Sequence, residues 1–313
     1  MTNVFDGIFE SAGCEGALCV RALDGAERGT EVAVRADTAM APASVLKVQI
    51  ALEVESAFTD GRLDPRERLL LRAGERTPGP VGLSLFEDDT ELSLRDAAVL
   101  MLTISDNATT DALLRLVGVD AVNATAARLG LTGTHLAGDL QSLLDTLGRD
   151  LGRADWSDAL AWTATASEDE LADADGRLFT GRALDPLRST RTTARDMAEL
   201  LDAIWTDRAG PPAACARMRT MMGRQLTRHR LAAGFRPPVR VAAKSGSLVG
   251  VVRNEVGVVT HPDGRRYAAA VFTRSRPGSD DAAINRAIGT AASRAVALLR
   301  GERQSEERQP DGR

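Results

Sequence analysis

The sequence predicts an α+β fold in which strands from both ends of the chain form one sheet, with a helical lobe inserted between them. Three observations support this prediction. Short apolar runs bounded by turn residues occur near both ends, helical periodicity dominates the middle, and the last strand-like run precedes one long amphipathic helix. The 313 residues are enough for one large domain or two closely associated ones.

The first predicted elements are a hairpin and a buried helix. Residues 16–23 form an apolar run that ends at Asp24-Gly25, and residues 31–35 follow, which predicts two paired strands. From Pro42 onward the hydrophobic period changes to that of a helix. Residues 45–52 are apolar on most sides of that helix, so we expect it to lie at the centre of the protein.

The remaining regular elements follow the same two periods. Further helices are predicted at residues 94–103, 107–117, 119–129 and 194–204. Strands rich in Val and Ala are predicted at residues 239–243, 249–260 and 266–273, ahead of a terminal helix at 281–299.

Two stretches lack a clear period. Residues 138–191 contain an acidic run at 168–175, and their composition predicts an irregular, solvated surface insertion. Residues 301–313 are nearly all charged, Gln, Pro or Gly, which predicts a disordered tail.

The composition excludes several classes of protein. Hydrophobic residues make up 43% and charged residues 27%, as in ordinary soluble domains. The net charge of −5 provides no basic surface for nucleic acid or an anionic membrane, so neither partner is expected. No run approaches the roughly 20 apolar residues of a membrane helix. The start of the chain lacks a secretion signal, which predicts a cytoplasmic location unless a leader has been removed.

The cysteines and histidines do not form a recognisable site. Three cysteines without a C-x-x-C pair fit reduced, buried thiols: Cys14, Cys19 and Cys215. The histidines are far apart in the sequence and show no ligand spacing: His135, His229 and His261. We therefore expect neither a metal nor an organic cofactor.

The first chemical motif is Ser44-Val45-Leu46-Lys47, at the start of the predicted central helix. Residues three apart share a helix face, so the Lys47 amine is within reach of the Ser44 hydroxyl. A buried amine with a lowered proton affinity can take the proton of a serine and make it a nucleophile. Alone, this motif is weak, because S-x-x-K occurs by chance in many proteins.

Two further motifs each have a plain structural interpretation. Ser105-Asp106-Asn107 lies between two predicted helices, where its side chains can face a cleft or simply cap the second helix. Lys244-Ser245-Gly246 lies on a predicted strand, where the lysine can instead protect a sheet edge. Gly246 permits a ligand to lie close to the strand backbone.

Together and in this order, the three motifs resemble S-x-x-K, S-D-N and K-[ST]-G of the serine β-lactamase and penicillin-binding-protein superfamily, class A in particular. Residues 192–197 resemble the family's T-T-P-x-x-M helix start, and residues 253–255 its R-N-D strand segment. The resemblance implies an antiparallel sheet and a single domain over residues 1–300. It divides that domain into an α/β lobe (1–40 and 205–300) and an all-helical lobe (41–204), in a monomeric protein.

The resemblance also implies roles for individual residues. Ser44 would be the acylated nucleophile, Lys47 its proton partner and Ser105 the proton shuttle to the leaving nitrogen. The other implied roles concern substrate binding: Asn107 for a substrate amide, Lys244 for positive potential, Ser245 and Arg253 for a carboxylate, and the backbone N–H groups of Ser44 and Ser247 for the oxyanion.

One class A feature is missing from the sequence. No E-x-x-L-N pentapeptide supplies a glutamate to activate the deacylating water. Glu168 and Asp139 are the two candidates for this base, and both also fit solvated loop positions. In addition, the interval from Ser105 to Lys244 is longer than in ordinary class A enzymes.

The sequence thus predicts a serine hydrolase that acts on a small molecule with an amide, ester or β-lactam carbonyl through an acyl-serine intermediate. One alternative is a cytoplasmic esterase, amidase or acyltransferase of a biosynthetic pathway with the same residues. The other is a non-catalytic binding domain on the same fold.

Overall fold

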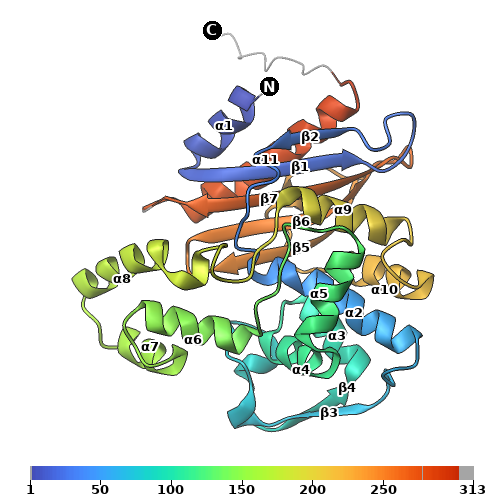
Figure 1. Cartoon of the computed structure of the whole chain (residues 1–313). Helices are drawn as coiled ribbons and strands as arrows, with labels where there is room; N and C mark the ends of the chain where they lie inside the picture. The colour runs from blue at the N-terminus through green and yellow to red at the C-terminus, as the bar shows by residue number, and fades with distance from the viewer. Residues whose placement is uncertain (1, 277, 303–313) are drawn as a thin grey trace.

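A five-stranded antiparallel sheet forms the centre of the upper lobe (Figure 1). The computed structural model describes residues 2–276 and 278–302, with side chains from residue 4 onward. In spatial order the strands are β2 (Glu31–Val34), β1 (Cys14–Ala22), β7 (Arg266–Ser275), β6 (Val252–Thr260) and β5 (Arg240–Leu248). The two N-terminal strands pair with the three C-terminal ones through β1 and β7, which confirms the predicted sheet.

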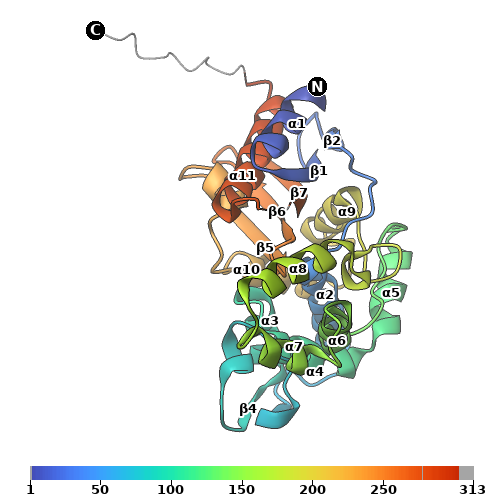
Figure 2. The ribbon, with the colours of Figure 1, turned by 90° about the vertical axis from the view of Figure 1, so that its left-hand side faces the viewer.

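Helices cover both faces of this sheet (Figure 2). On one face, α1 (Thr2–Ser11) and α11 (Asp281–Leu299) share an apolar cluster with Leu18 and Val20 of β1. On the other face, α9 (Ala194–Trp205) packs in a second cluster with Ala17 and Cys19. Side chains alternate across a strand, so one strand contributes to both clusters. Helix α1 was not predicted from the sequence.

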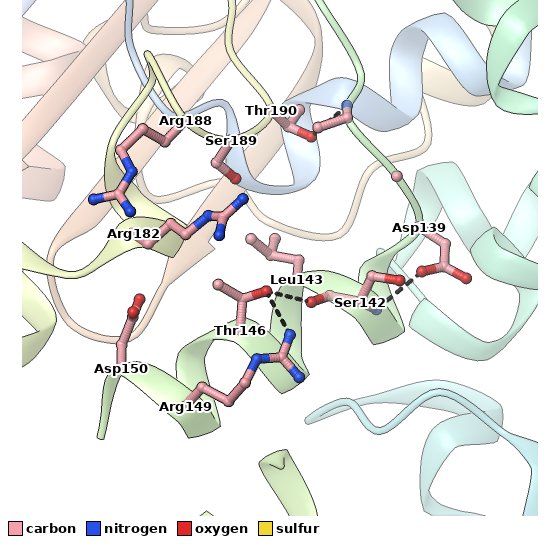
Figure 3. Close-up of a pocket in the computed structure, with 12 residues that line it drawn as sticks. Asp139, Ser142, Leu143, Thr146, Arg149, Asp150, Arg182, Arg188, Ser189 and Thr190 are labelled. Carbon is pink, nitrogen blue, oxygen red and sulfur yellow. Dashed lines mark hydrogen bonds between the residues drawn. The ribbon is translucent and has the colours of Figure 1, made fainter. Parts of the chain in front are cut away.

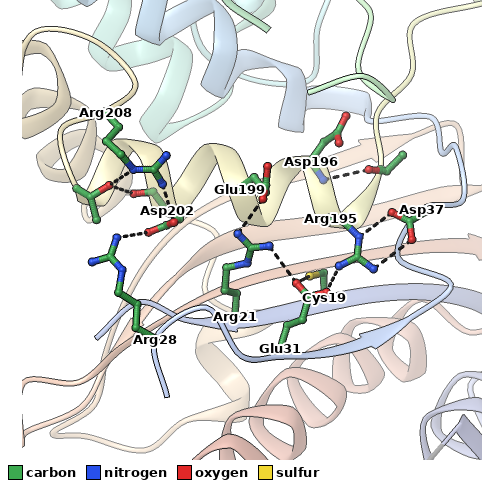
Figure 4. Close-up of polar contacts among 12 residues, drawn as sticks. Cys19, Arg21, Arg28, Glu31, Asp37, Arg195, Asp196, Glu199, Asp202 and Arg208 are labelled. Atoms are coloured by element: carbon green, nitrogen blue, oxygen red, sulfur yellow. Dashed lines mark hydrogen bonds and ion pairs between the residues drawn. The ribbon is translucent and has the colours of Figure 1, made fainter. Parts of the chain in front are cut away.

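Ion pairs attach α9 to the β1–β2 hairpin (Figure 4). Arg21 Nη1 lies 2.8 Å from Glu199 Oε1, and Arg195 Nε lies 2.7 Å from Asp37 Oδ1. Glu31 pairs with both Arg21 and Arg195. The apolar cluster beneath α9 also includes apolar side chains from residues 48–54 of the central helix, so the two lobes share one core. The division at residue 205 stays a prediction.

The lower lobe surrounds α2 (Lys47–Thr59), whose residues from Lys47 to Ala57 are all buried, as predicted for the central helix. Around it lie α3 (Leu94–Thr103), α4 (Asn107–Val117), α5 (Val119–Arg128) and α10 (Pro212–Met222). The prediction of an all-helical lobe is wrong. A two-stranded sheet of β3 (Arg68–Leu71) and β4 (Thr90–Ser93) is part of it, and strands of only four residues give a weak sequence signal.

The prediction of an irregular insertion at 138–191 is also wrong. This segment forms α6 (Leu140–Asp150), α7 (Trp156–Thr163) and α8 (Glu168–Thr180) around an apolar cluster that includes Leu147, Leu178 and Leu184. The acidic run lies on the exposed side of α8 and begins in its first turn, where negative charge favours a helix N-terminus. The prediction relied on composition, which does not report the amphipathic pattern of these helices.

The remaining sequence predictions concern thiols, membranes and the tail. All three cysteines are free and buried, as predicted, and burial raises the pKa of Cys14 and of Cys19 to about 11. Within residues 2–276 and 278–302, no helix is long and apolar enough to cross a membrane. Over the same residues, no group of three or more His, Cys, Asp or Glu is arranged to hold a metal ion. Most of the predicted disordered tail, residues 303–313, lies outside the described residues.

Candidate active site

Ser44 lies on a 3₁₀ turn, η1 (Ala43–Leu46), that continues directly into α2. Its neighbour Ala43 has a φ of 49°, a left-handed conformation that costs of order 1–3 kcal/mol for a residue with a side chain. Asn254 on β6 stabilises the preceding backbone, because its Nδ2 donates to the carbonyl oxygens of Ala41 at 2.9 Å and Pro42 at 3.1 Å. The nucleophile candidate is therefore presented on a strained turn that the sheet supports.

Gly246 on β5 lies against this turn. A Cβ atom at position 246 would stand 2.7 Å from the Pro42 carbonyl oxygen and 3.1 Å from the Ser44 nitrogen. No other residue type fits there without a shift of the backbone. The close approach places the β5 backbone beside the backbone N–H of Ser44.

Two buried lysines converge on Ser105. Lys47 Nζ donates to the Ser105 carbonyl oxygen at 2.6 Å and to its hydroxyl at 3.2 Å, and Asn107 Oδ1 accepts from the same ammonium at 2.7 Å. Lys244 Nζ donates to Ser105 Oγ at 2.9 Å and to the Ser245 carbonyl oxygen at 2.7 Å. Lys47, Ser105, Asn107 and Lys244 thus form one hydrogen-bonded chain, the lysine chain, although 139 residues separate Ser105 from Lys244. Among the described residues, the Ser44 hydroxyl forms no hydrogen bond with this chain.

Both lysines are fully buried, and this changes their acidity. Burial lowers the pKa of Lys47 to about 7, and the carboxylates of Asp106 and Asp111 counteract part of that shift. Burial also lowers the pKa of Lys244 well below its ordinary value, and the nearby Lys47 charge adds to the effect. A lysine with a pKa near 7 has a substantial neutral fraction, so it can accept a proton at physiological pH.

The second motif caps a helix and also contacts Lys47. Asp106 is the N-cap of α4, where its Oδ1 accepts from the Thr109 N–H at 2.7 Å. Ser105 precedes it with a φ of 67°, and Asn107 Nδ2 donates to the Pro78 carbonyl oxygen at 2.8 Å. The cap holds the helix start, and this leaves Ser105 and Asn107 facing Lys47.

Arg253, which was predicted to bind a substrate carboxylate, is engaged by groups of the protein itself. Arg253 is buried, forms an ion pair with Asp281 and donates to the Gly250 carbonyl oxygen and Ser275 Oγ. Another guanidinium takes the position beside β5. Arg230 Nη2 donates to the exposed Ser247 hydroxyl at 2.6 Å, while its Nη1 donates to the Gly246 carbonyl oxygen at 2.8 Å.

Sequence reasoning missed Arg230 because it lies in an irregular segment between α10 and β5, without motif or period. The arrangement places a buried cation behind the hydroxyl of Ser247. Ser245, whose hydroxyl was predicted to bind a carboxylate, is half-buried on the same strand.

Neither candidate for the deacylating base contacts the lysine chain. Glu168 is the exposed first residue of α8. Asp139 is the N-cap of α6, where its Oδ1 accepts from the Ser142 N–H at 2.9 Å. The carboxylates that act on the Lys47 pKa are Asp106 and Asp111, not these two. Their positions fit structural roles at two helix starts.

Comparison with known proteins agrees with this geometry. The model of the β-lactamase enzyme family matches residues 1–299. The β-lactamase regulatory protein BlaB of Streptomyces cacaoi is 31% identical over 283 residues, which cover 86% of this chain and 87% of that protein. A β-lactamase structure from Sphaerobacter thermophilus superposes with a TM-score of 0.74 at 26% identity, over 96% of both chains.

An ancestral class A β-lactamase superposes with a TM-score of 0.74 at 20% identity, over 95% of this chain and 99% of the other. The structure named PBP-A gives a TM-score of 0.72 at 23% identity, over 96% and 97% of the two chains. These two likenesses concern the fold. With the fold, the three motifs and the family match in agreement, the chain belongs to the β-lactamase enzyme family and has the class A fold.

Proposed function

We propose that this protein is acylated on Ser44 by β-lactams or related amides and esters, and that it hydrolyses the acyl-serine slowly. The observation that carries the proposal is the buried chain in which Lys47 and Lys244 both donate to Ser105 Oγ. Two ammonium groups so close together, with little water, favour loss of a proton from one of them.

In the acylation step, the neutral Lys47 amine takes the Ser44 proton. The ammonium uses all three N–H groups on Ser105 and Asn107, so loss of one proton frees a lone pair. The Ser44 oxygen then bonds to the carbonyl carbon and the C–N or C–O bond breaks. Ser105, linked to both lysines, passes a proton to the leaving nitrogen or oxygen, which balances the step.

The negative charge on the carbonyl oxygen would be stabilised by the backbone N–H groups of Ser44 and Ser247. The approach of β5 to η1 at Gly246 supports this role, because it places the two backbones side by side. Each such donor contributes roughly 3–4 kcal/mol in serine hydrolases. A carboxylate on the substrate would be bound by the hydroxyls of Ser245 and Ser247, with the buried Arg230 cation behind Ser247.

Slow deacylation follows from the surroundings of Lys47. Its hydrogen-bond partners within the described part of the chain are Ser105 and Asn107, and neither Glu168 nor Asp139 is among them. Hydrolysis of an acyl-serine needs a base that holds a water molecule next to the ester. If neither Glu168 nor Asp139 holds that water, the adduct would outlast that of an efficient β-lactamase.

The test is intact-protein mass spectrometry after mixing with benzylpenicillin. We expect one adduct, absent from Ser44→Ala and persisting for many minutes after removal of free penicillin. Rapid steady turnover would instead identify an efficient β-lactamase. Turnover of simple esters without any penicillin adduct would favour the esterase alternative. If the folded wild type forms no penicillin adduct and does not turn over esters, the non-catalytic binding domain would be favoured.

A regulatory role is the second candidate, and the relative named a regulatory protein favours it. A long-lived adduct suits a sensor, because the modified protein persists as a signal, whereas rapid hydrolysis would erase it. The discriminating experiment compares two strains, one that carries the wild-type protein and one that carries Ser44→Ala. The measurement is the change in gene expression of each strain after a β-lactam is added. A response that needs Ser44 but does not scale with hydrolysis supports sensing.

A further inference from the structure

A pocket of about 390 Å³ lies within the helical segment 138–191 (Figure 3). The residues that line it do not include any member of the lysine chain. Its walls come from α6 and the residues just before it, and from residues 182–190. Leu143 provides an apolar wall, and Thr146 and Ser189 present hydroxyl groups. This volume is within the range of pockets that hold small ligands.

Three guanidinium groups line the pocket: Arg149, Arg182 and Arg188. Across residues 2–276 and 278–302, none of the three forms an ion pair. Arg149 Nη2 donates only to Thr146 Oγ1, at 3.0 Å.

Two other arginines of the same segment are engaged, in contrast. Arg177 pairs with Asp173, and Arg153 stacks over the Trp162 ring at 4.4 Å. Segment 138–191 therefore offers carboxylates and an aromatic ring to its arginines. Among the described residues, the three arginines of the pocket form neither an ion pair nor a cation–π contact.

Two carboxylates also line the pocket, and each accepts a backbone N–H through one of its oxygens. Asp139 Oδ1 accepts from the Ser142 N–H at 2.9 Å, and Asp150 Oδ2 accepts from the Ala183 N–H at 2.8 Å. Figure 3 shows these carboxylates at opposite ends, with Arg182, Ser189 and Thr146 between them. The centre of the pocket thus combines positive charge with hydroxyl donors.

We propose that this pocket binds a small oxyanion with at least two negative charges, either a phosphate or a polycarboxylate. Guanidinium groups bind both through paired N–H···O bonds, and the hydroxyls of Thr146 and Ser189 supply further donors. Binding here does not depend on acylation of Ser44, so the proposal is independent of the function proposed above.

The site is connected to the nucleophile through the fold. Residues 188–190 lead directly to Arg191 and Thr192, and Thr192 is bridged to Met40. Leu144 and Leu147 of α6 share an apolar cluster with Ala41 and Ala43, which precede Ser44. An anion in the pocket would therefore lie next to the segment that supports the acylation site.

The test is isothermal titration of the whole protein with inorganic phosphate and, separately, with citrate, in a buffer free of other polyvalent anions. We expect saturable binding of at least one probe, weakened about tenfold or more in Arg182→Gln and in Arg188→Gln. The matched control is Arg177→Gln, which removes a paired arginine of the same segment and should retain wild-type affinity. The probe that binds more tightly identifies the ligand class, phosphate or polycarboxylate.

Several results would overturn the proposal. One is the absence of saturable binding of either probe up to about 10 mM. Such an affinity would be weaker than three charged contacts should provide. Another is equal loss in Arg177→Gln, which would indicate general charge rather than this pocket. Insensitivity to added NaCl would also contradict it, because exposed ion pairs are screened by salt. Circular dichroism of each variant separates a lost site from a lost fold.

Discussion

If Ser44 is acylated as proposed, the pH dependence of the acylation rate should report the acidity of the buried Lys47. Its pKa of about 7 means that the amine is mostly protonated at pH 6 and mostly neutral at pH 8. By the titration of a single group, the neutral fraction rises from about one tenth to about nine tenths over this range. We therefore expect the rate of adduct formation on Ser44 to rise about tenfold between pH 6 and pH 8, then to level off.

The cause of the shift can be tested separately from its size. Asp111 raises the Lys47 pKa, so Asp111→Asn should move the midpoint of the rate profile to lower pH. Asp111 also accepts from the Leu140 N–H at 2.9 Å and from the Thr77 hydroxyl at 2.7 Å, so the folded state of this variant must be verified.

The assay is stopped-flow or quenched labelling with a fluorescent penicillin at constant ionic strength, with Ser44→Ala as the blank. A flat profile from pH 6 to 8, or a midpoint near the ordinary lysine value of about 10.4, would refute Lys47 as the proton acceptor. Asp111→Asn moving the midpoint upward would refute the electrostatic explanation.

Four further outcomes follow from the same contacts. Glu168→Gln and Asp139→Asn should each change the adduct lifetime less than about twofold, since neither side chain reaches the lysine chain; a trapped adduct in mass spectrometry would make that residue the base. Gly246→Ala should lower the unfolding free energy by about 1–3 kcal/mol in urea melts and slow labelling, because the new Cβ meets the Pro42 carbonyl; unchanged values would contradict the close approach. Arg230→Gln should raise the concentration of a carboxylate-bearing substrate needed for half-maximal labelling about tenfold or more, with little effect on substrates without a carboxylate. Folding lowers the Lys47 pKa from 10.5 to about 7, so the unfolded state binds more protons than the folded state between these pH values. The free energy of unfolding should therefore rise with pH in that window. Lys47→Met should flatten this rise, measured by thermal melts.

The sequence by itself was sufficient for the features that depend on local pattern. The central helix at 45–52, the terminal helix and the late strands are encoded by periods of 3.6 and 2, which any segment shows without its neighbours. The three motifs were identifiable from their residue types and their order along the chain. Short strands such as β3 and β4, and the amphipathic helices under an acidic surface, were missed because their local signals are weak.

Only the tertiary structure decided which distant groups meet. The convergence of Lys47 and Lys244 on Ser105 depends on β5 packing against η1. Arg230 contacts Ser247 on β5, whereas Arg253 pairs with Asp281 on α11. The arginine pocket likewise arises from α6 and residues 182–190 coming together. Such contacts are set by the packing of whole elements around a shared core. Burial, charge and orientation at one residue therefore depend on side chains a hundred or more positions away.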